Sequence, residues 1–201
     1  GAALLRVLAA LAEPVAVLLR VRRLDDAAGE AFDKIARVMG YPYPGGPHID
    51  RLAAEGNPDA IEFPKALSEK GNLEFSFSGL KSAVLNYLNS EKQKGNPIND
   101  ADVAASFQKS VVDVLVEKTL EAAKLSGCKV VTVAGGVSAN KGLQNALADM
   151  CEREGLTFYR PGKILSTDNA AMIGCRAYYM AKAGKFADLT LNAKPSVPIG
   201  L

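Results

Sequence analysis

The sequence predicts an α/β fold in which a mixed sheet is flanked by helices, and three observations support this prediction. Short β-branched segments alternate with amphipathic helical patterns through the second half of the chain. Glycine or small polar residues stand at each strand-to-helix junction. Hydrophobic residues make up 48% and charged residues 23% of the 201 residues, as in an ordinary soluble globular protein. The chain is long enough for one large domain or two small ones.

The first predicted helices surround a rigid turn. Asp26 is placed to cap a helix that runs to about Met39 and stops at Gly40. The segment 41–47 contains three prolines and two glycines, which exclude both helix and strand and predict an exposed turn. A short helix over about 49–55 follows. The core face of the first helix is formed by Ala28, Phe32, Ile35, Ala36 and Met39.

The middle of the chain predicts one strand and two helices. Residues 73–77 have the pattern of a strand, and Ser78 is a natural N-cap for a helix over about 80–90. The polar, Lys-rich stretch 91–97 predicts a loop. A long amphipathic helix is expected over 100–126, because apolar residues recur along one of its faces.

A strand–turn–helix unit comes next. The segment 129–133 is short and β-branched, which predicts a buried strand. Gly135 and Gly136 then turn the chain into a helix that begins near Ser138 or Asn140 and runs to about residue 154. Glycines at such a junction let a phosphate approach the N–H groups of the helix start, but a tight turn that needs positive φ predicts them equally well. Asn140 is either a helix cap or an amide that reads a base or ribose.

A second such unit closes the pattern. A strand is expected over 156–160, followed by a loop and by a helix that ends near residue 183. Thr167 or Asp168 caps this helix. As an alternative to capping, Asp168 offers a carboxylate to a divalent cation. Because ligands of such sheets lie beyond the carboxyl ends of the strands, we expect the junctions to meet at one pocket.

Acidic side chains of the first two helices have two interpretations each. Asp33 lies within a helix, where Asp is a poor helix former. It is either a solvated residue paired with Lys34 or Arg37, or a group that binds a ribose hydroxyl. Asp50, after the Gly-Gly turn, has the same two interpretations. Glu30 and Asp33 are spaced either as an acid–base pair or as part of a solvated helix face.

The cysteines, the single histidine and the first 23 residues limit which kinds of site and which location the sequence predicts. Three cysteines stand far apart with no CxxC pair, which favours buried thiols in a reducing cytoplasm over disulfides. His48, the only histidine, has no neighbouring nucleophile, so any metal site built from this chain alone is carboxylate-rich or incomplete. Residues 1–23 predict a helix over 2–12, a break at Pro14 and a strand over 15–23. They offer neither a membrane span nor a secretory signal.

Five motifs, in a fixed order, carry a resemblance to a known family. They are DDAAGEAFDK, YPYPGGP, EFSFSGLKSAV, AGGVSAN and STDNAAMIG. Over about 24–195 the sequence resembles the C-terminal part of the TsaD family, the tRNA adenosine threonylcarbamoyltransferases formerly described as O-sialoglycoprotein endopeptidases. The resemblance implies the ATPase fold shared by actin, sugar kinases and heat-shock chaperones. Residues 24–201 would be its C-terminal nucleotide-binding lobe, and residues 1–23 an atypical N-terminal segment.

The resemblance also implies a reaction and the residues that serve it. A threonylcarbamoyl group would pass from its adenylate to the exocyclic amine of the adenosine beside the tRNA anticodon. The residues implied to bind that adenylate, or ATP or AMP, are Asp33, Gly46, Asp50, Gly135, Gly136 and Asn140. The two aspartates and the first glycine would contact chiefly the ribose, the glycine pair the phosphate, and the asparagine the nucleoside. Asp168 would be a ligand of a divalent metal ion, whether iron, zinc or magnesium.

Partners follow from the same resemblance: tRNA, a TsaB-like paralogue and a TsaE-like P-loop ATPase, in the cytoplasm. The family's metal site also uses two histidines four residues apart in an N-terminal lobe, and this sequence contains no such pair. We therefore expect a chain that is weak or inactive alone, with exposed apolar surface and self-association where that lobe would pack. An alternative is a non-catalytic nucleotide-binding or interaction module of the same fold. A protease or a sugar kinase fits less well.

Overall fold

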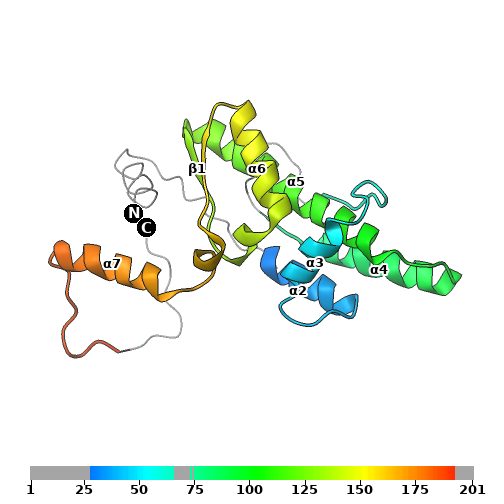
Figure 1. The fold of residues 1–201 in the computed structure, drawn as a ribbon, viewed down its shortest axis with the longest axis horizontal. Coiled ribbons are helices and arrows are strands. Elements are labelled where there is room, and N and C mark those ends of the chain that lie inside the picture. The colour runs from blue at the N-terminus through cyan, green and yellow to red at the C-terminus, as the bar shows by residue number, and fades with distance from the viewer. Residues whose placement is uncertain (1–27, 66–72, 74, 193–201) are drawn as a thin grey trace.

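Helix α5 forms the axis of the structure (Figure 1). The computed structural model describes residues 28–65, 73 and 75–192. Its helices are α2 (Ala28–Val38), α3 (Gly46–Ala53), α4 (Ser78–Lys94), α5 (Asp100–Ser126), α6 (Lys141–Arg153) and α7 (Ala170–Lys182), and its strands are β1 (Val130–Thr132) and β2 (Thr157–Tyr159). Helix α5 contacts α3, α4, α6 and β1. The predicted mixture of helices and strands is confirmed, while the predictions within residues 1–23 lie outside the described residues.

Helix α5 has the predicted bounds because a capping residue stands at each of its ends. The Asn99 side chain accepts a hydrogen bond from the backbone N–H of Ala101 at 3.1 Å. At the other end, Gly127 takes the left-handed conformation with φ of 69°, which ends the helix at little cost. Twenty-seven residues thus form one rigid rod.

Helix α4 is longer than predicted. It runs to Lys94 instead of ending near residue 90, because Glu91 to Lys94 are good helix formers and Gly95 (φ 72°) supplies the stop. The Glu91 carboxylate accepts from Asn96 Nδ2 and Lys94 Nζ, each at 2.7 Å, and these bonds lower its pKa. At the other end, Ser78 is the first helical residue and does not cap the helix.

The described strands form a two-stranded parallel sheet. Val131 pairs with Phe158 and Thr132 with Tyr159, so the carboxyl ends of both strands lie at the same edge. The prediction of a fully buried strand over 129–133 is wrong, because only Val131 of β1 is buried. Helices α5 and α6 pack against the strand pair, α5 on β1 and α6 on β2 (Figure 1).

Two apolar clusters share α5. The larger one joins α2, α3, α4 and the first half of α5, where the rings of Phe32 and Phe107 pack edge to face at 5.2 Å. The smaller one joins α5, α6 and β1. It contains Cys151, whose burial raises the pKa of its thiol. The prediction of buried cysteines holds for Cys151 alone, since Cys128 and Cys175 are partly exposed.

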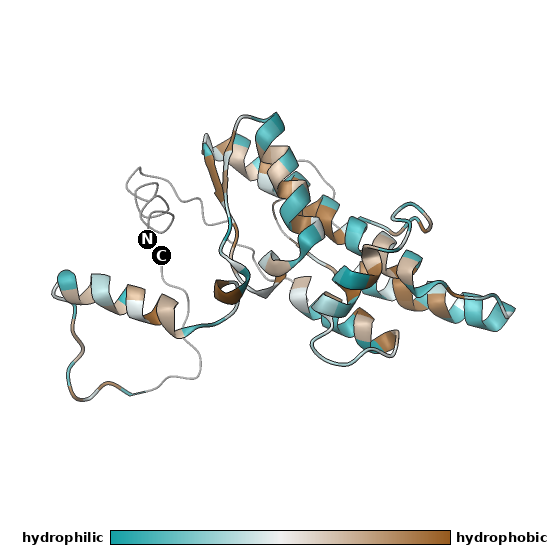
Figure 2. Ribbon diagram, viewed as in Figure 1, coloured by the Kyte–Doolittle hydropathy of each residue, from teal (hydrophilic) through white to brown (hydrophobic). Residues whose placement is uncertain are grey.

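Helix α7 stands apart from the other elements (Figures 1 and 2). It contains no buried residue, and Asn169 caps it through a 3.0 Å hydrogen bond from the Met172 N–H. Large apolar side chains are exposed along it and beyond it, namely Met172, Ile173, Tyr178, Tyr179, Met180, Phe186, Leu189 and Leu191. Within the described ranges, no helix combines the length and apolar character needed to cross a membrane.

We predict that Phe107→Ala lowers the free energy of unfolding by about 3–5 kcal/mol, because a fully buried ring is lost from the larger cluster. Leu125→Ala, on the same helix but 69% exposed, is the matched control and changes it by about 0.5 kcal/mol or less. Urea unfolding followed by circular dichroism measures both variants. Equal losses would contradict the placement of Phe107 in the core.

Candidate functional site

The glycine turn lies at the carboxyl end of β1. Gly135 has φ of 89° and ψ of 173°, a conformation that requires glycine, so the tight-turn interpretation is correct for this residue. Gly136 has an ordinary φ, is exposed, and begins a short 3₁₀ helix, Gly136–Ala139. The Ser138 hydroxyl donates to Gly135 O at 2.7 Å and closes the turn.

Asn140 caps α6, as one of its two interpretations predicted. Its Oδ1 accepts from the Leu143 N–H at 2.8 Å, and its Nδ2 donates to Gln108 Oε1 on α5 at 2.6 Å. The residue is only 8% exposed. Gly142 leaves room for this contact, since a Cβ there would lie 2.6 Å from Gln108 Nε2. Sequence analysis missed Gln108, whose one visible feature is an amide within a mostly apolar helix.

Asp50 ties α3 to the same helix start. Its Oδ1 accepts from the backbone N–H of Lys141, the first residue of α6, at 3.1 Å. This N–H is one of the donors that a helix start leaves unpaired, and a carboxylate is favoured there by the helix dipole. Asp50 and Asn140 are therefore brought together at the start of α6, although they lie 90 positions apart in the sequence.

Asp33 holds the proline- and glycine-rich turn. Its Oδ1 accepts from the Gly45 N–H at 2.7 Å. Among the described residues it forms no ion pair with Lys34 or Arg37, so the predicted pairing is wrong, and Lys34 instead lies 2.8 Å from Glu30. That Glu30–Lys34 pair fits the solvated helix face and not an acid–base pair with Asp33.

The two glycines of this turn differ in their surroundings. Gly45 is buried, and a Cβ on it would lie 2.5 Å from Ala36 Cβ and 2.8 Å from Asp33 Cα. No atom lies within 4 Å of the corresponding point on Gly46, which begins α3. Gly45 is therefore needed for packing, while Gly46 faces open space. The sequence pattern pointed to Gly46, while the packing role of Gly45 had no signal in it.

Direct contacts join these positions into one region. Asp33 holds Gly45, Gly46 begins the helix that carries Asp50, and Asp50 binds the residue that follows Asn140. Helix α2 also touches the 3₁₀ helix after the glycine turn. The predicted nucleotide-binding residues are thus brought together from α2, α3 and the start of α6.

Asp168 is not tied to this region. It is exposed, and no hydrogen bond in the part of the chain that the structure describes links it to the predicted nucleotide residues. Capping by Thr167 or Asp168 is wrong, because Asn169 caps α7. Across residues 28–65, 73 and 75–192, no group of three or more His, Cys, Asp or Glu is placed to hold a metal ion. The described residues alone therefore do not fit the implied cation.

His48 packs against the ring of a neighbouring tyrosine. Its ring stacks on that of Tyr41 with the centroids 5.6 Å apart, and Arg51 Nη2 lies 3.4 Å from its Nδ1. The Tyr41 hydroxyl donates to Asp100 at 3.0 Å. Burial and the Asp100 carboxylate raise the pKa of Tyr41.

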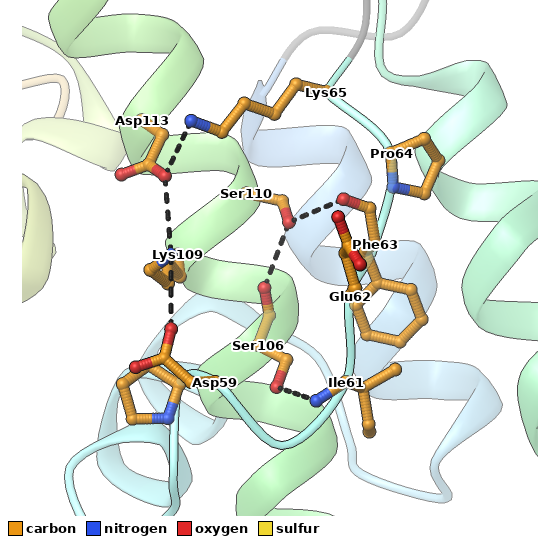
Figure 3. Close-up of a pocket in the computed structure, with 11 residues that line it drawn as sticks. Asp59, Ile61, Glu62, Phe63, Pro64, Lys65, Ser106, Lys109, Ser110 and Asp113 are labelled. Carbon is orange, nitrogen blue, oxygen red and sulfur yellow. Dashed lines mark hydrogen bonds and ion pairs between the residues drawn. The ribbon is translucent and has the colours of Figure 1, made fainter.

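A cavity of about 650 Å³ lies elsewhere, between residues 58–65 and α5 (Figure 3). Lys65 lies 3.0 Å from Asp113 and from Glu117, and Lys109 lies 3.3 Å from Asp59. Burial lowers the pKa of Lys65, but the carboxylates outweigh it and the net shift is upward. None of the predicted site residues lines this cavity, and four of its charged groups, Asp59, Lys65, Lys109 and Asp113, are paired with one another or with Glu117.

Comparisons with known proteins point to one family. The model of TsaD, tRNA N6-adenosine threonylcarbamoyltransferase, matches residues 10–175. A protein named tRNA N6-adenosine threonylcarbamoyltransferase from Moorella thermoacetica is 57% identical over 175 residues, which are 87% of this chain and 51% of that protein. One of the same name from Clostridium botulinum (strain Kyoto / Type A2) is 53% identical over 176 residues, 88% and 52%. The chain spans about half the length of these relatives.

The difference between the two turn glycines is testable. We predict that Gly45→Ala lowers the free energy of unfolding by about 1–3 kcal/mol, because the new methyl group collides with the backbone of α2. Gly46→Ala meets no atom and changes it by about 0.5 kcal/mol or less. Thermal unfolding compares the two, and the account fails if Gly46→Ala is the more damaging substitution.

Proposed function

Since the chain belongs to the TsaD family of tRNA N6-adenosine threonylcarbamoyltransferases, we propose that it forms the part of such an enzyme that holds the adenosine nucleotide. In this proposal, residues 24–201 form the C-terminal nucleotide-binding lobe of an actin-like ATPase fold. The threonylcarbamoyl group passes from its adenylate to the exocyclic amine of a tRNA adenosine. The observation that carries the proposal is the convergence of Asp33, Gly46, Asp50 and the Gly135–Asn140 segment.

The two aspartates are suited to bind ribose hydroxyls. Each has one carboxylate oxygen fixed by a backbone N–H, that of Gly45 for Asp33 and that of Lys141 for Asp50. The second oxygen of each has no hydrogen-bond partner among the described residues. A carboxylate held in this way keeps an oriented acceptor for a hydroxyl group at little further entropic cost.

The glycine turn is suited to the phosphate. Gly135 and Gly136 carry no side chain and are exposed where the chain enters a helix start, so an anion can approach backbone N–H groups closely. In transfer from an adenylate, AMP leaves as the amine attacks the carbamoyl carbon, and negative charge grows on its phosphate. Donors already aimed at that phosphate stabilise the departing charge.

A divalent cation would polarise the carbamoyl carbonyl when bound. One exposed carboxylate does not make a metal site. We therefore propose Asp168 as one ligand of a site completed by groups from outside the described residues. The tRNA, a TsaB-like paralogue and a TsaE-like P-loop ATPase are proposed as partners.

A second function is favoured by α7. Its exposed apolar side chains include Met172 and Ile173, and the helix buries no residue, which fits a surface for self-association or for another protein. The chain would then be a non-catalytic nucleotide-binding or interaction module. Measured transfer activity separates the two functions.

Nucleotide binding is the first test. We predict that AMP raises the melting temperature of the chain, because a ligand that binds only the folded state stabilises it. Gly46→Ala and Gly136→Ala place a methyl group in space that the nucleotide would occupy. Each substitution raises the dissociation constant for AMP at least about fivefold, a loss of roughly 1 kcal/mol of binding free energy, and so reduces the rise in melting temperature. Gly174→Ala on α7, also in open space but outside the site, is the control that keeps the stabilisation by AMP. If millimolar AMP leaves the melting temperature of the wild-type chain unchanged, nucleotide binding is refuted.

Activity is the second test. The chain is combined with a separately produced N-terminal half of the Moorella thermoacetica relative, and modified adenosine in tRNA is measured by mass spectrometry. We expect product only when both parts and the threonylcarbamoyl-adenylate are present. AMP binding without any product in the mixture would favour the non-catalytic module.

A further inference from the structure

We propose that Arg160 is an anion-binding residue of the same site, which contacts the phosphate of the bound nucleotide; this inference rests on the proposed function. Arg160 follows β2, just as the glycine turn follows β1. The strands are parallel, Thr132 is in register with Tyr159, and the Val133 N–H donates to Tyr159 O at 3.2 Å. The residues that leave the two strands therefore emerge side by side at one edge of the sheet.

A series of hydrogen bonds directs the guanidinium toward the turn. Arg160 Nη1 donates to Gln144 Oε1 at 2.6 Å, and Gln144 Nε2 donates to Ser138 O at 2.6 Å. Ser138 in turn donates to Gly135 O at 2.7 Å. Gln144 thus acts as a positioning residue that links the charged group to the glycine turn. The side chain of Arg160 is thereby tied to α6 and, through Gln144, to the turn, although the residue itself is exposed.

The charge of Arg160 is available for a ligand. Some cations on the described surface are paired with carboxylates: Lys65, Lys109 and Lys124 lie 3.0 to 3.3 Å from carboxylate oxygens. Arg160, by contrast, contacts a neutral amide, and none of the described carboxylates forms an ion pair with it. One of its N–H groups is used by Gln144, which leaves the others of the planar fork for an anion.

A phosphate is the anion that this setting favours. Hydrogen bonds through Gln144 and Ser138 link the positive side chain to the glycine turn, where the exposed Gly135 and Gly136 leave the backbone accessible to an anion. An arginine binds a phosphate through parallel charge-assisted hydrogen bonds. Arg160 would then supply the positive charge that Gly135 and Gly136 lack, and it would add to the affinity for AMP but not for adenosine.

The test compares AMP with adenosine by calorimetric titration of the full chain. Arg160→Met keeps an unbranched apolar side chain and removes the charge. We predict that it raises the dissociation constant for AMP about tenfold and changes that for adenosine less than about twofold, because only AMP carries the phosphate. Arg160→Lys restores the charge without the planar fork and recovers part of the AMP affinity. Thermal unfolding checks that both variants are folded.

Arg153→Met is the matched control. Arg153 is an exposed arginine in the last turn of α6, and its Nε donates to the backbone oxygen of Asp149 at 3.3 Å. If the effect of Arg160 is local, the Arg153→Met variant keeps wild-type affinity for AMP and for adenosine. An equal loss of AMP affinity in Arg153→Met would overturn the proposal, because general charge would then explain the result.

Different results would overturn the proposed nucleotide binding and the role of Arg160. A wild-type chain that binds neither AMP nor adenosine refutes the proposed function, and the role of Arg160 falls with it. A wild-type chain that binds AMP, together with an Arg160→Met variant that binds AMP equally well, overturns the role of Arg160 alone. So does a variant that loses affinity for AMP and adenosine to the same extent.

Discussion

The start of helix α6 is the point on which the arrangement of the proposed site depends. A helix start leaves backbone N–H groups unpaired, and here two of them are satisfied by side chains: Asn140 binds the N–H of Leu143, and Asp50 binds that of Lys141. The Nδ2 group of the same Asn140 side chain donates to Gln108 Oε1 on α5. Helices α3, α5 and α6 are thereby joined within one hydrogen-bonded unit, which sets where the glycine turn lies relative to the aspartates.

The long helix α5 makes this unit rigid. Because it belongs to both apolar clusters, it couples the α2–α3 region to the β1–α6 region through one continuous backbone. A site assembled from such elements is preorganised, so that little entropy is lost when a nucleotide is ordered between them. Helix α7 is different, because it buries nothing and its position is not fixed by either cluster. The proposed nucleotide contacts therefore depend on α2, α3, α5 and α6, and not on α7.

Helix ends and caps could be predicted from the sequence, while hydrogen bonds between residues far apart in the sequence could not. The bounds of α5 follow from Asn99 and Gly127, and the cap at Asn140 follows from its place before an apolar helical pattern. The bond between Gln108 and Asn140 joins residues 32 positions apart, and no periodicity encodes it. Thr167 and Asp168 were the predicted caps of α7, but the helix begins later and Asn169 caps it. The exposure of β1 depended on how many helices cover the sheet, which no strand pattern contains.

The central claim, that these turns and helix starts form one nucleotide site, is tested most directly by nuclear magnetic resonance. Backbone amide signals of the ¹⁵N-labelled chain are followed while AMP is added. The account predicts that the signals of Gly46, Asp50, Gly135, Gly136 and Asn140 shift together along one binding curve. Shifts confined to the cavity beside Lys65 and Lys109, with those five signals unmoved, would contradict it.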